Sequence, residues 1–155
     1  GLKKATKNNV KIVHEENLID DLWPIIEENL KEKYDSKPVH TKDEIVRLLR
    51  LFPENIKCVC AKLDESVVSG VIFFTAETVV KAQYIASRKE GLEVCALDKL
   101  FDYYIDDSFS KKIRWFDFGT SNSNSGKELN QNLYKYKIEF GAGSVVYSSY
   151  VKDLN

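Results

Sequence analysis

The sequence contains no methionine, only three cysteines and two histidines, and a net charge of only −1. The cysteines, Cys58, Cys60 and Cys95, are odd in number and lack the spacing of metal ligands, which indicates reduced thiols. We therefore expect a cytoplasmic protein without a metal site. Because the initiator methionine is also absent, we expect residues 1–9 to be a tag remnant or a flexible N-terminal segment, and the chain could be one piece of a longer protein.

Long apolar runs and an excess of charge of one sign are absent too. No run approaches the roughly 20 apolar residues of a membrane-spanning helix, so we expect no membrane partner. The 23 Lys and Arg residues nearly balance the 24 Asp and Glu residues, which gives no general attraction to nucleic acid. With 155 residues, 43% of them hydrophobic, the chain can form one domain with a core. We expect residues 10–155 to form that domain.

Hydrophobic periodicity and capping motifs predict the order of strands and helices. Thr41–Glu44 and Ser125–Glu128 are capping boxes that open two of the helices, and Asn17 can cap another. The predicted strands are 10–14, 56–63, 67–76, 79–87, 111–119 and one or two within 144–154. The predicted helices are 17–30, 41–52, 92–105 and 125–140. Gly70, inside a strand, predicts a bulge or a close backbone approach.

This order is β-α-α-β-β-β-α-β-α-β(β), and it predicts an α/β fold (α+β in some schemes). We expect a mixed central sheet of six to seven strands with about four helices. The strands on either side of the third helix can pair in parallel only through that helix, by a right-handed crossover.

The same order resembles the GNAT acyl-CoA N-acyltransferase fold. In that family the fourth strand leads into the third helix through a turn of pattern Q/R-x-x-G-x-G/A, and Arg88–Glu93 supplies the arginine and the first glycine. Glu93 departs from the pattern, because it replaces a small residue. A narrower resemblance, to Fem-type aminoacyltransferases and related GNAT-like proteins, covers "FDFGTSN" and the lysine four residues before the glycine of a terminal "FG", here Lys137 and Gly141.

The resemblance implies acetyl-CoA or another acyl-CoA as co-substrate. The turn would hold its pyrophosphate at unpaired helix N–H groups, with Gly91 allowing a close approach and Arg88 adding charge. The implied cofactor-binding residues are Tyr84, Ile85 and Ala86, whose backbone would pair with the pantetheine arm, Arg88, Lys89, Glu90, Gly91 and Leu92 in the turn, and Asn130. Two alternatives stay open: Ser87–Glu90 could be an ordinary capping box, and Glu93 could compete with the phosphate.

For catalysis the resemblance implies an acid on the last helix, where many members carry a tyrosine. Lys137 holds that position, with Tyr134 beside it as a further candidate. Asp117, between two phenylalanines at a strand end, could be a general base or orient an amine. It could equally accept N–H bonds from residues 119–121 in an Asx-type turn.

Three functions are therefore weighed. The first is an acyl-CoA-dependent transferase acting on a small-molecule amine. The second is a Fem-type transferase with an aminoacyl-tRNA donor, the one case in which nucleic acid would be a partner. The third is a degenerate GNAT module used for binding or assembly, as a homodimer or with a partner domain of a longer chain.

Overall fold

The computed structural model describes residues 1–152, without the side chains of Glu16 and Ser125, in two compact units. The first unit spans Gly1–Gly119 and the second begins at Thr120. No helix among the described residues is long and apolar enough to cross a membrane.

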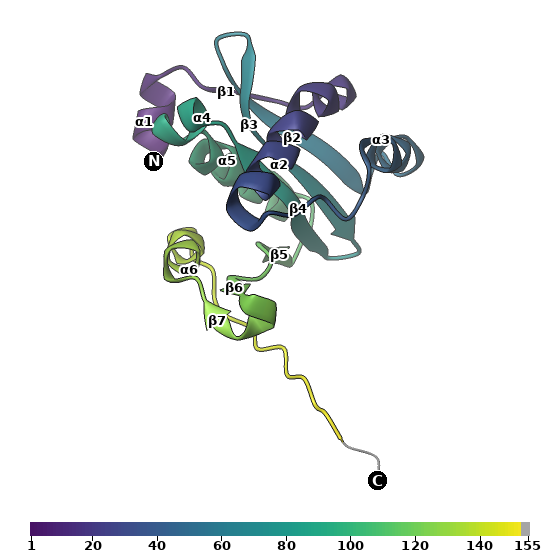
Figure 1. The fold of residues 1–155 in the computed structure, drawn as a ribbon. Coiled ribbons are helices and arrows are strands. Elements are labelled where there is room, and N and C mark those ends of the chain that lie inside the picture. Colours follow the sequence, from purple (N-terminus) through teal and green to yellow (C-terminus); the bar gives the residue numbers. More distant parts are fainter. Residues whose placement is uncertain (153–155) are drawn as a thin grey trace. The chain divides into compact units, whose positions relative to one another are not determined.

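A five-stranded mixed sheet organises the first unit (Figure 1). Its strands, in spatial order, are β1 (Lys11–Val13), β2 (Ile56–Leu63), β3 (Ser66–Ala76), β4 (Val79–Ser87) and β5 (Trp115–Asp117). β1 to β4 are antiparallel neighbours, and two-residue turns join β2 to β3 and β3 to β4. Asp64 and Glu77 adopt the left-handed backbone that such turns require. β5 follows a helix and pairs parallel to β4, as predicted.

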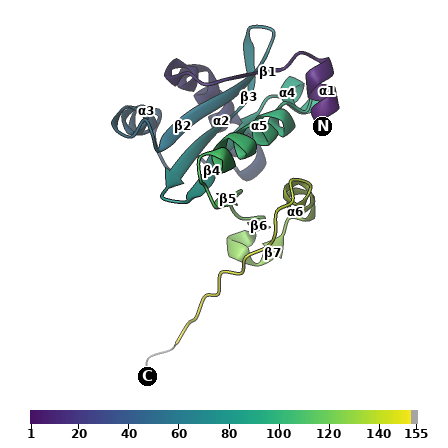
Figure 2. The same ribbon diagram turned by 180° about the vertical axis from the view of Figure 1, so that it is seen from behind.

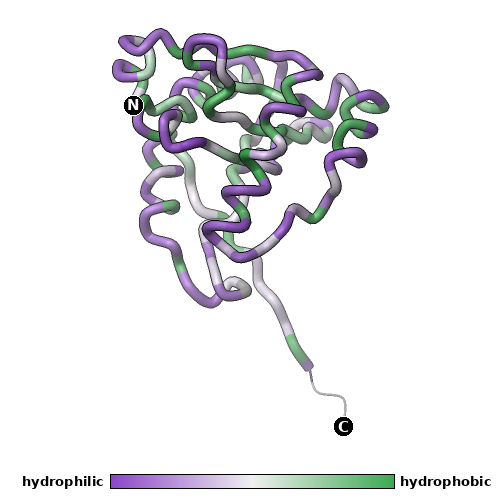
Figure 3. Tube along the Cα trace, turned by 45° about the horizontal axis from the view of Figure 1, so that its top comes forward, coloured by the Kyte–Doolittle hydropathy of each residue, from purple (hydrophilic) through white to green (hydrophobic). Residues whose placement is uncertain are grey.

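Helices cover both faces of this sheet. One face packs against α2 (Ile19–Tyr34) and α3 (Lys42–Leu51). The other packs against α5 (Ala96–Ser110), where Phe73 stacks on Tyr104 with ring centroids 3.8 Å apart. Figure 2 shows α5 from its own side. In Figure 3 the helical coils alternate between hydrophobic and hydrophilic residues, the pattern of helices with one buried face.

Gly70 lies close to a side chain of α2, rather than at a bulge or beside another backbone as predicted. A Cβ atom there would lie 2.6 Å from a methyl carbon of Leu22, so any larger residue at position 70 would displace the Leu22 side chain of α2. The capping box of Thr41 and Glu44 at the start of α3 is confirmed. The predicted cap at Asn17 is wrong, because a 3-10 turn (Glu16–Leu18) precedes α2 and no side chain caps the helix.

The segment predicted as one helix at 92–105 forms two helices, α4 (Lys89–Glu93) and α5. Cys95 between them has a left-handed backbone, with φ of 56°, which breaks the helical path. The strand predicted over 111–119 is shorter, because the N–H groups of Lys111, Lys112 and Ile113 bond to the end of α5. The segment expected to be a tag remnant or flexible, residues 1–9, contains helix α1 (Leu2–Lys7), in which Ala5 is buried.

The second unit is small. It contains a two-stranded ladder of β6 (Asn122–Ser123) and β7 (Glu128–Leu129) around a 3-10 turn (Asn124–Gly126), followed by α6 (Gln131–Ile138). The helix predicted from Ser125 therefore starts later, because Gly126 has φ of 88° and Asn130 caps α6 instead.

The strands predicted within 144–154 are not present over 144–152, and the remainder lies outside the described residues. A strand needs a neighbour for its backbone, and no strand of residues 1–152 pairs with this segment. Over the described residues the main sheet therefore has five strands rather than the predicted six or seven.

Candidate cofactor site

The strands β4 and β5 part after a short stretch of pairing. Their partners are Val79 with Trp115, Val80 with Phe116 and Lys81 with Asp117. From Ala82 onward β4 pairs with β3 alone among the strands of the described residues. The second half of β4 therefore has an edge that no strand covers.

Alternation along β4 decides which backbone groups face this edge. The N–H and C=O of Ser87 bond to the side chain of Asn29, not to the opposite residue of β3, so Ser87 faces the edge. In an antiparallel ladder the facing direction alternates, so Ile85 also faces the edge, whereas Tyr84 and Ala86 face β3. Of the three residues expected to pair with pantetheine, Ile85 presents its backbone to the open side.

A bulge lies just before Ile85. Ile72 of β3 is opposite Tyr84, and the next residue, Phe73, is opposite Ala82, which leaves Gln83 as an extra residue in β4. Bulges re-aim backbone groups and often occur beside functional sites. The uncovered edge of β4 therefore begins next to this bulge in the pairing of β3 with β4.

The turn after β4 forms the first turn of α4. Arg88 is its N-cap residue, with extended backbone and no side-chain cap. The N–H groups of Lys89, Glu90 and Gly91 have no hydrogen-bond acceptor in the described chain, and the first intrahelical bond runs from Leu92 N–H to Arg88 C=O at 3.1 Å. Such N–H groups carry partial positive charge and suit an anion.

The alternative of a Ser87–Glu90 capping box is wrong. The Ser87 hydroxyl lies 2.6 Å from the Ser69 hydroxyl and 3.0 Å from the Arg88 carbonyl oxygen. It therefore belongs to a buried polar cluster beneath the turn. Glu93 does not occupy the anion position either: its side chain is exposed and accepts no hydrogen bond from a described N–H group.

Gly91 serves the contact between α4 and β3. A Cβ atom at this position would lie 2.3 Å from Ser69 Oγ, 2.5 Å from the Val68 carbonyl oxygen and 2.7 Å from Ser87 Oγ. These distances are too short for any side chain. The glycine of the motif therefore lets the turn lie directly on the neighbouring strand.

Charges of both signs surround the turn. Arg88 and Glu90 line a hollow of about 490 Å³ beside the β2–β3 turn, together with the carboxylates of Asp21, Asp64 and Glu65. Arg88 is the one cation in that lining. An anion bound at the turn would thus depend on Arg88 and the main-chain N–H groups.

The catalytic candidates lie in both units. Asp117 ends β5, and its Oδ1 accepts a hydrogen bond from Gly119 N–H at 2.6 Å, the Asx-type contact that was one of its two interpretations. In the second unit Lys137 Nζ donates to the Thr120 carbonyl oxygen at 2.7 Å, and the Tyr134 hydroxyl accepts from Ser144 Oγ at 3.2 Å. Asn130 accepts from Leu133 N–H at 3.0 Å as the cap of α6.

Two residues near β4 were missed by sequence reasoning. His40 places Nδ1 2.7 Å from the Tyr84 hydroxyl, and its main-chain N–H donates to the same oxygen. Nothing in the sequence connects residues 44 positions apart. Asn29 gave a usable signal, because it continues the buried face that α2 forms with Leu22, Ile25 and Ile26.

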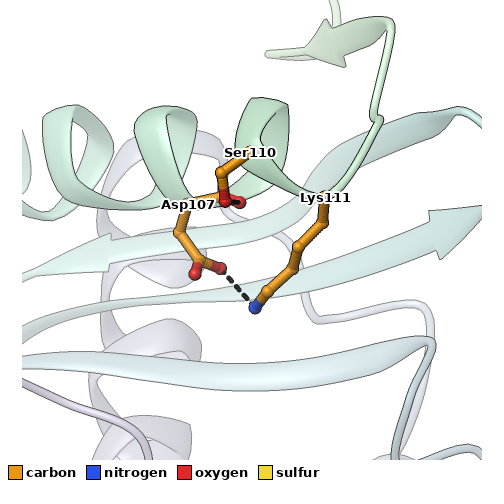
Figure 4. Close-up of polar contacts among 3 residues, drawn as sticks. All are labelled: Asp107, Ser110 and Lys111. Atoms are coloured by element: carbon orange, nitrogen blue, oxygen red, sulfur yellow. Dashed lines mark hydrogen bonds and ion pairs between the residues drawn. The ribbon is translucent and has the colours of Figure 1, made fainter.

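A second hollow, of about 360 Å³, lies where β1 ends and α5 terminates. His14 contacts Tyr103 edge to face, and Asp107 forms an ion pair with Lys111 at 2.8 Å (Figure 4). Burial lowers the pKa of His14 below its usual 6.5, an effect that Asp107 opposes and that Lys111 and Lys57 reinforce. No His, Cys, Asp and Glu side chains of the described residues form a group that could hold a metal ion.

The lowered pKa of His14 predicts a loss of stability in acid. The folded protein binds this proton less readily than the unfolded chain, so the stabilisation is full above pH 6.5 and declines as pH falls toward the folded-state pKa. We expect His14→Gln to lack this decline. Urea unfolding of both proteins at pH 7.5, 6.5 and 5.5 measures the free energy of unfolding. If the difference in this free energy between the wild type and His14→Gln is the same at all three pH values, the prediction is contradicted.

Comparison with known proteins identifies the family. The family model of the GNAT acetyltransferase domain matches residues 2–137. No curated protein matches the chain.

Several solved structures share the fold. A possible acetyltransferase from Clostridium difficile 630 is 15% identical, with a TM-score of 0.72 over 94% of this chain and 98% of that one. An aminoglycoside acetyltransferase from an uncultured soil metagenomic sample, in complex with sisomicin, is 15% identical, with a TM-score of 0.67 over 95% and 99%. AAC(6′)-Iy, in complex with a bisubstrate analogue of coenzyme A and acetylneamine, is 12% identical, with a TM-score of 0.62 over 94% and 99%.

These matches support the GNAT acetyltransferase domain and do not support the predicted Fem-type subgroup. The family match spans most of the sequence, and the order and pairing of the strands agree with it. The chain belongs to the GNAT acetyltransferase domain family.

Proposed function

We propose that this chain moves the acyl group of acetyl-CoA, or of another acyl-CoA, to the amine of a small molecule. The observation that carries the proposal is the parting of β4 from β5 next to a turn with three unpaired N–H groups. GNAT acetyltransferases use acetyl-CoA as co-substrate, and a solved structure of the same fold holds a coenzyme A analogue.

Binding would use main-chain groups on β4 and at the turn. The edge-facing N–H and C=O of Ile85 would pair with an amide of the pantetheine arm, as in strand addition to a sheet edge. The N–H groups of Lys89, Glu90 and Gly91 would hold the pyrophosphate, with added charge from Arg88 and Lys89. Leu92, more than half exposed, follows in the same turn.

The reaction requires one proton to leave the amine and one to reach the departing sulfur. A C–N bond forms as the thioester C–S bond breaks. We assign Asp117 as the base that accepts the proton from the amine, and Lys137 or Tyr134 as the acid that donates a proton to the sulfur. We assign Asn130 a contact with the cofactor. Each of these roles is a proposal: the observed bonds of Asp117 to Gly119 and of Lys137 to Thr120 fix where the two side chains lie within their own units.

Thermal unfolding with increasing acetyl-CoA tests the proposal. A ligand that binds only the folded state at 100 times its Kd adds about 2.7 kcal/mol of stability. For a protein of this size that corresponds to a rise in Tm of roughly 5–10 °C. Acetyl-N-acetylcysteamine, a thioester without the pyrophosphate, is the matched control and should give a much smaller rise. An unchanged Tm at millimolar acetyl-CoA would contradict the proposal.

Turnover separates the remaining alternatives. Release of coenzyme A thiol should accelerate when an amine is added, and aminoglycosides, amino acids and peptide N-termini form a suitable panel. Sisomicin, bound by one of the solved structures, belongs in it. Transfer from aminoacyl-tRNA but not from acetyl-CoA would favour the Fem-type function. Binding without transfer to any amine would favour the degenerate module, for which a homodimer or a partner domain stays a prediction.

A further inference from the structure

One polar side chain of α2 reaches across to the uncovered end of β4. Asn29 is 9% exposed and lies among the apolar residues of the helix face that covers the sheet. Its Nδ2 donates to the Ser87 carbonyl oxygen at 3.1 Å, and its Oδ1 accepts from Ser87 N–H at 3.1 Å. Lys33, one helical turn later, donates from Nζ to Asn29 Oδ1 at 3.4 Å.

These two bonds reproduce what a neighbouring strand would provide. A strand beside Ser87 would offer one acceptor and one donor, and the Asn29 amide offers both from one side chain. Within residues 84–87, Ile85 and Ser87 are the residues whose backbone N–H and C=O groups face the side of β4 that β5 does not cover. Since Asn29 engages Ser87, Ile85 is left as the position at which an extended ligand can pair.

The same contact supports the turn that follows. Ser87 bonds through its hydroxyl to Ser69, and Arg88 N–H donates to the Val68 carbonyl oxygen at 2.8 Å. Gly91 rests on the same group of atoms. Ser69, Ser87 and Asn29 are all buried, so this is a polar cluster inside an otherwise apolar core. A buried cluster with every member bonded specifies one geometry.

We propose that Asn29 is a positioning residue for the acyl-CoA site. By bonding to the backbone of Ser87, Asn29 leaves Ile85 as the last edge-facing residue of β4 that is available to a ligand. The same bonds fix the position of Ser87, so that the first turn of α4 is formed before ligand binds. The inference rests on the proposed function, because it assigns Asn29 a role in binding the same co-substrate.

Acetyl-CoA affinity of two Asn29 variants tests the inference. Asn29→Ala removes both bonds, and Asn29→Asp keeps the acceptor but places a carboxylate against the Ser87 carbonyl oxygen. We expect Kd and KM for acetyl-CoA to rise about tenfold in each, with kcat changed less than about twofold, since Asn29 does not contact the reacting atoms. The assay temperature is set where circular dichroism shows every variant folded, and if Asn29→Ala fails to fold, Asn29→Asp carries the test.

Asn55→Ala is the matched control. Asn55 also donates from Nδ2 to a strand carbonyl oxygen, that of Thr75 at 3.0 Å, but β2 begins next to it, at the opposite end of β3 from the Ser69–Ser87 pair. This variant should keep the wild-type Kd. Amide hydrogen exchange adds a readout that does not need ligand: the Ser87 amide should exchange at least tenfold faster in Asn29→Ala and unchanged in Asn55→Ala.

The outcomes are distinct. If the wild type does not bind acetyl-CoA, the proposed function fails whatever the variants do. If the wild type binds and both folded Asn29 variants keep its Kd, Asn29 has only a structural role and this inference is overturned. Raised Kd with unchanged kcat, together with faster exchange at Ser87, supports it.

Discussion

Replacing Gly91 with alanine is expected to lower the free energy of unfolding by about 2 kcal/mol, within the range measured for overpacked sites. The added methyl group would lie 2.5 Å from the Val68 carbonyl oxygen, a main-chain atom that cannot rotate away as the two serine hydroxyls can. To relieve the overlap, α4 must move off β3. Denaturant unfolding measures the loss.

The same displacement should weaken acetyl-CoA binding about tenfold, equivalent to about 1.4 kcal/mol. It moves the N–H groups of Lys89 and Glu90 away from where β4 ends, so the anion site and the strand edge no longer match. Gly143→Ala is the control, because a Cβ atom there meets nothing within 4 Å. Wild-type stability in Gly91→Ala would show that the turn is not pressed against β3.

Replacing Phe73 with alanine should have the largest effect on stability, a loss of about 3–5 kcal/mol. Phe73 is fully buried, stacks on Tyr104 and contacts Phe101 and Phe116 edge to face. Removing its ring leaves a cavity between β3 and α5. The loss would be measured by denaturant unfolding at neutral pH, followed by tryptophan fluorescence.

The matched control is Phe109→Ala. Phe109 belongs to α5, the helix that packs on Phe73, but its side chain is 47% exposed, so its truncation should cost about 0.5 kcal/mol. Because Phe116 belongs to β5, Phe73→Ala should also loosen the attachment of β5 to the sheet. A loss in Phe73→Ala no larger than in Phe109→Ala would contradict the packing described.

Much of the fold could be predicted because the informative signals are local. The strands at 56–63 and 79–87 have the predicted bounds, since polar or turn-forming residues bound each hydrophobic stretch. The break at Cys95 was not predictable, because a left-handed backbone at cysteine leaves no mark on hydrophobic periodicity. The terminal segment at 144–152 has strand-like alternation, but a strand also needs a partner, which its own residues do not specify.

The candidate site likewise has a part that a local motif predicts and a part that depends on contacts distant in the sequence. The motif at Arg88–Gly91 located the turn, and the resemblance pointed to residues 84–86 of β4, which lie beyond its pairing with β5. The polar cluster of Asn29, Ser69 and Ser87 depends on contacts 18 and 58 positions apart in the sequence. Such contacts exist only once the chain has folded, so single-sequence reasoning could at most note a polar residue on an apolar helix face.

The three-position pairing of β4 with β5 has a consequence for how such a protein can diverge. The proposed recognition through Ile85 and the amides of the turn uses main-chain atoms. Every residue type supplies these atoms equally, except that proline lacks the N–H group. Side chains along this edge can therefore be substituted during evolution as long as the path of the backbone is conserved. A sequence identity of about 15%, as with the solved structures of this fold, is in this way compatible with a conserved path of the backbone.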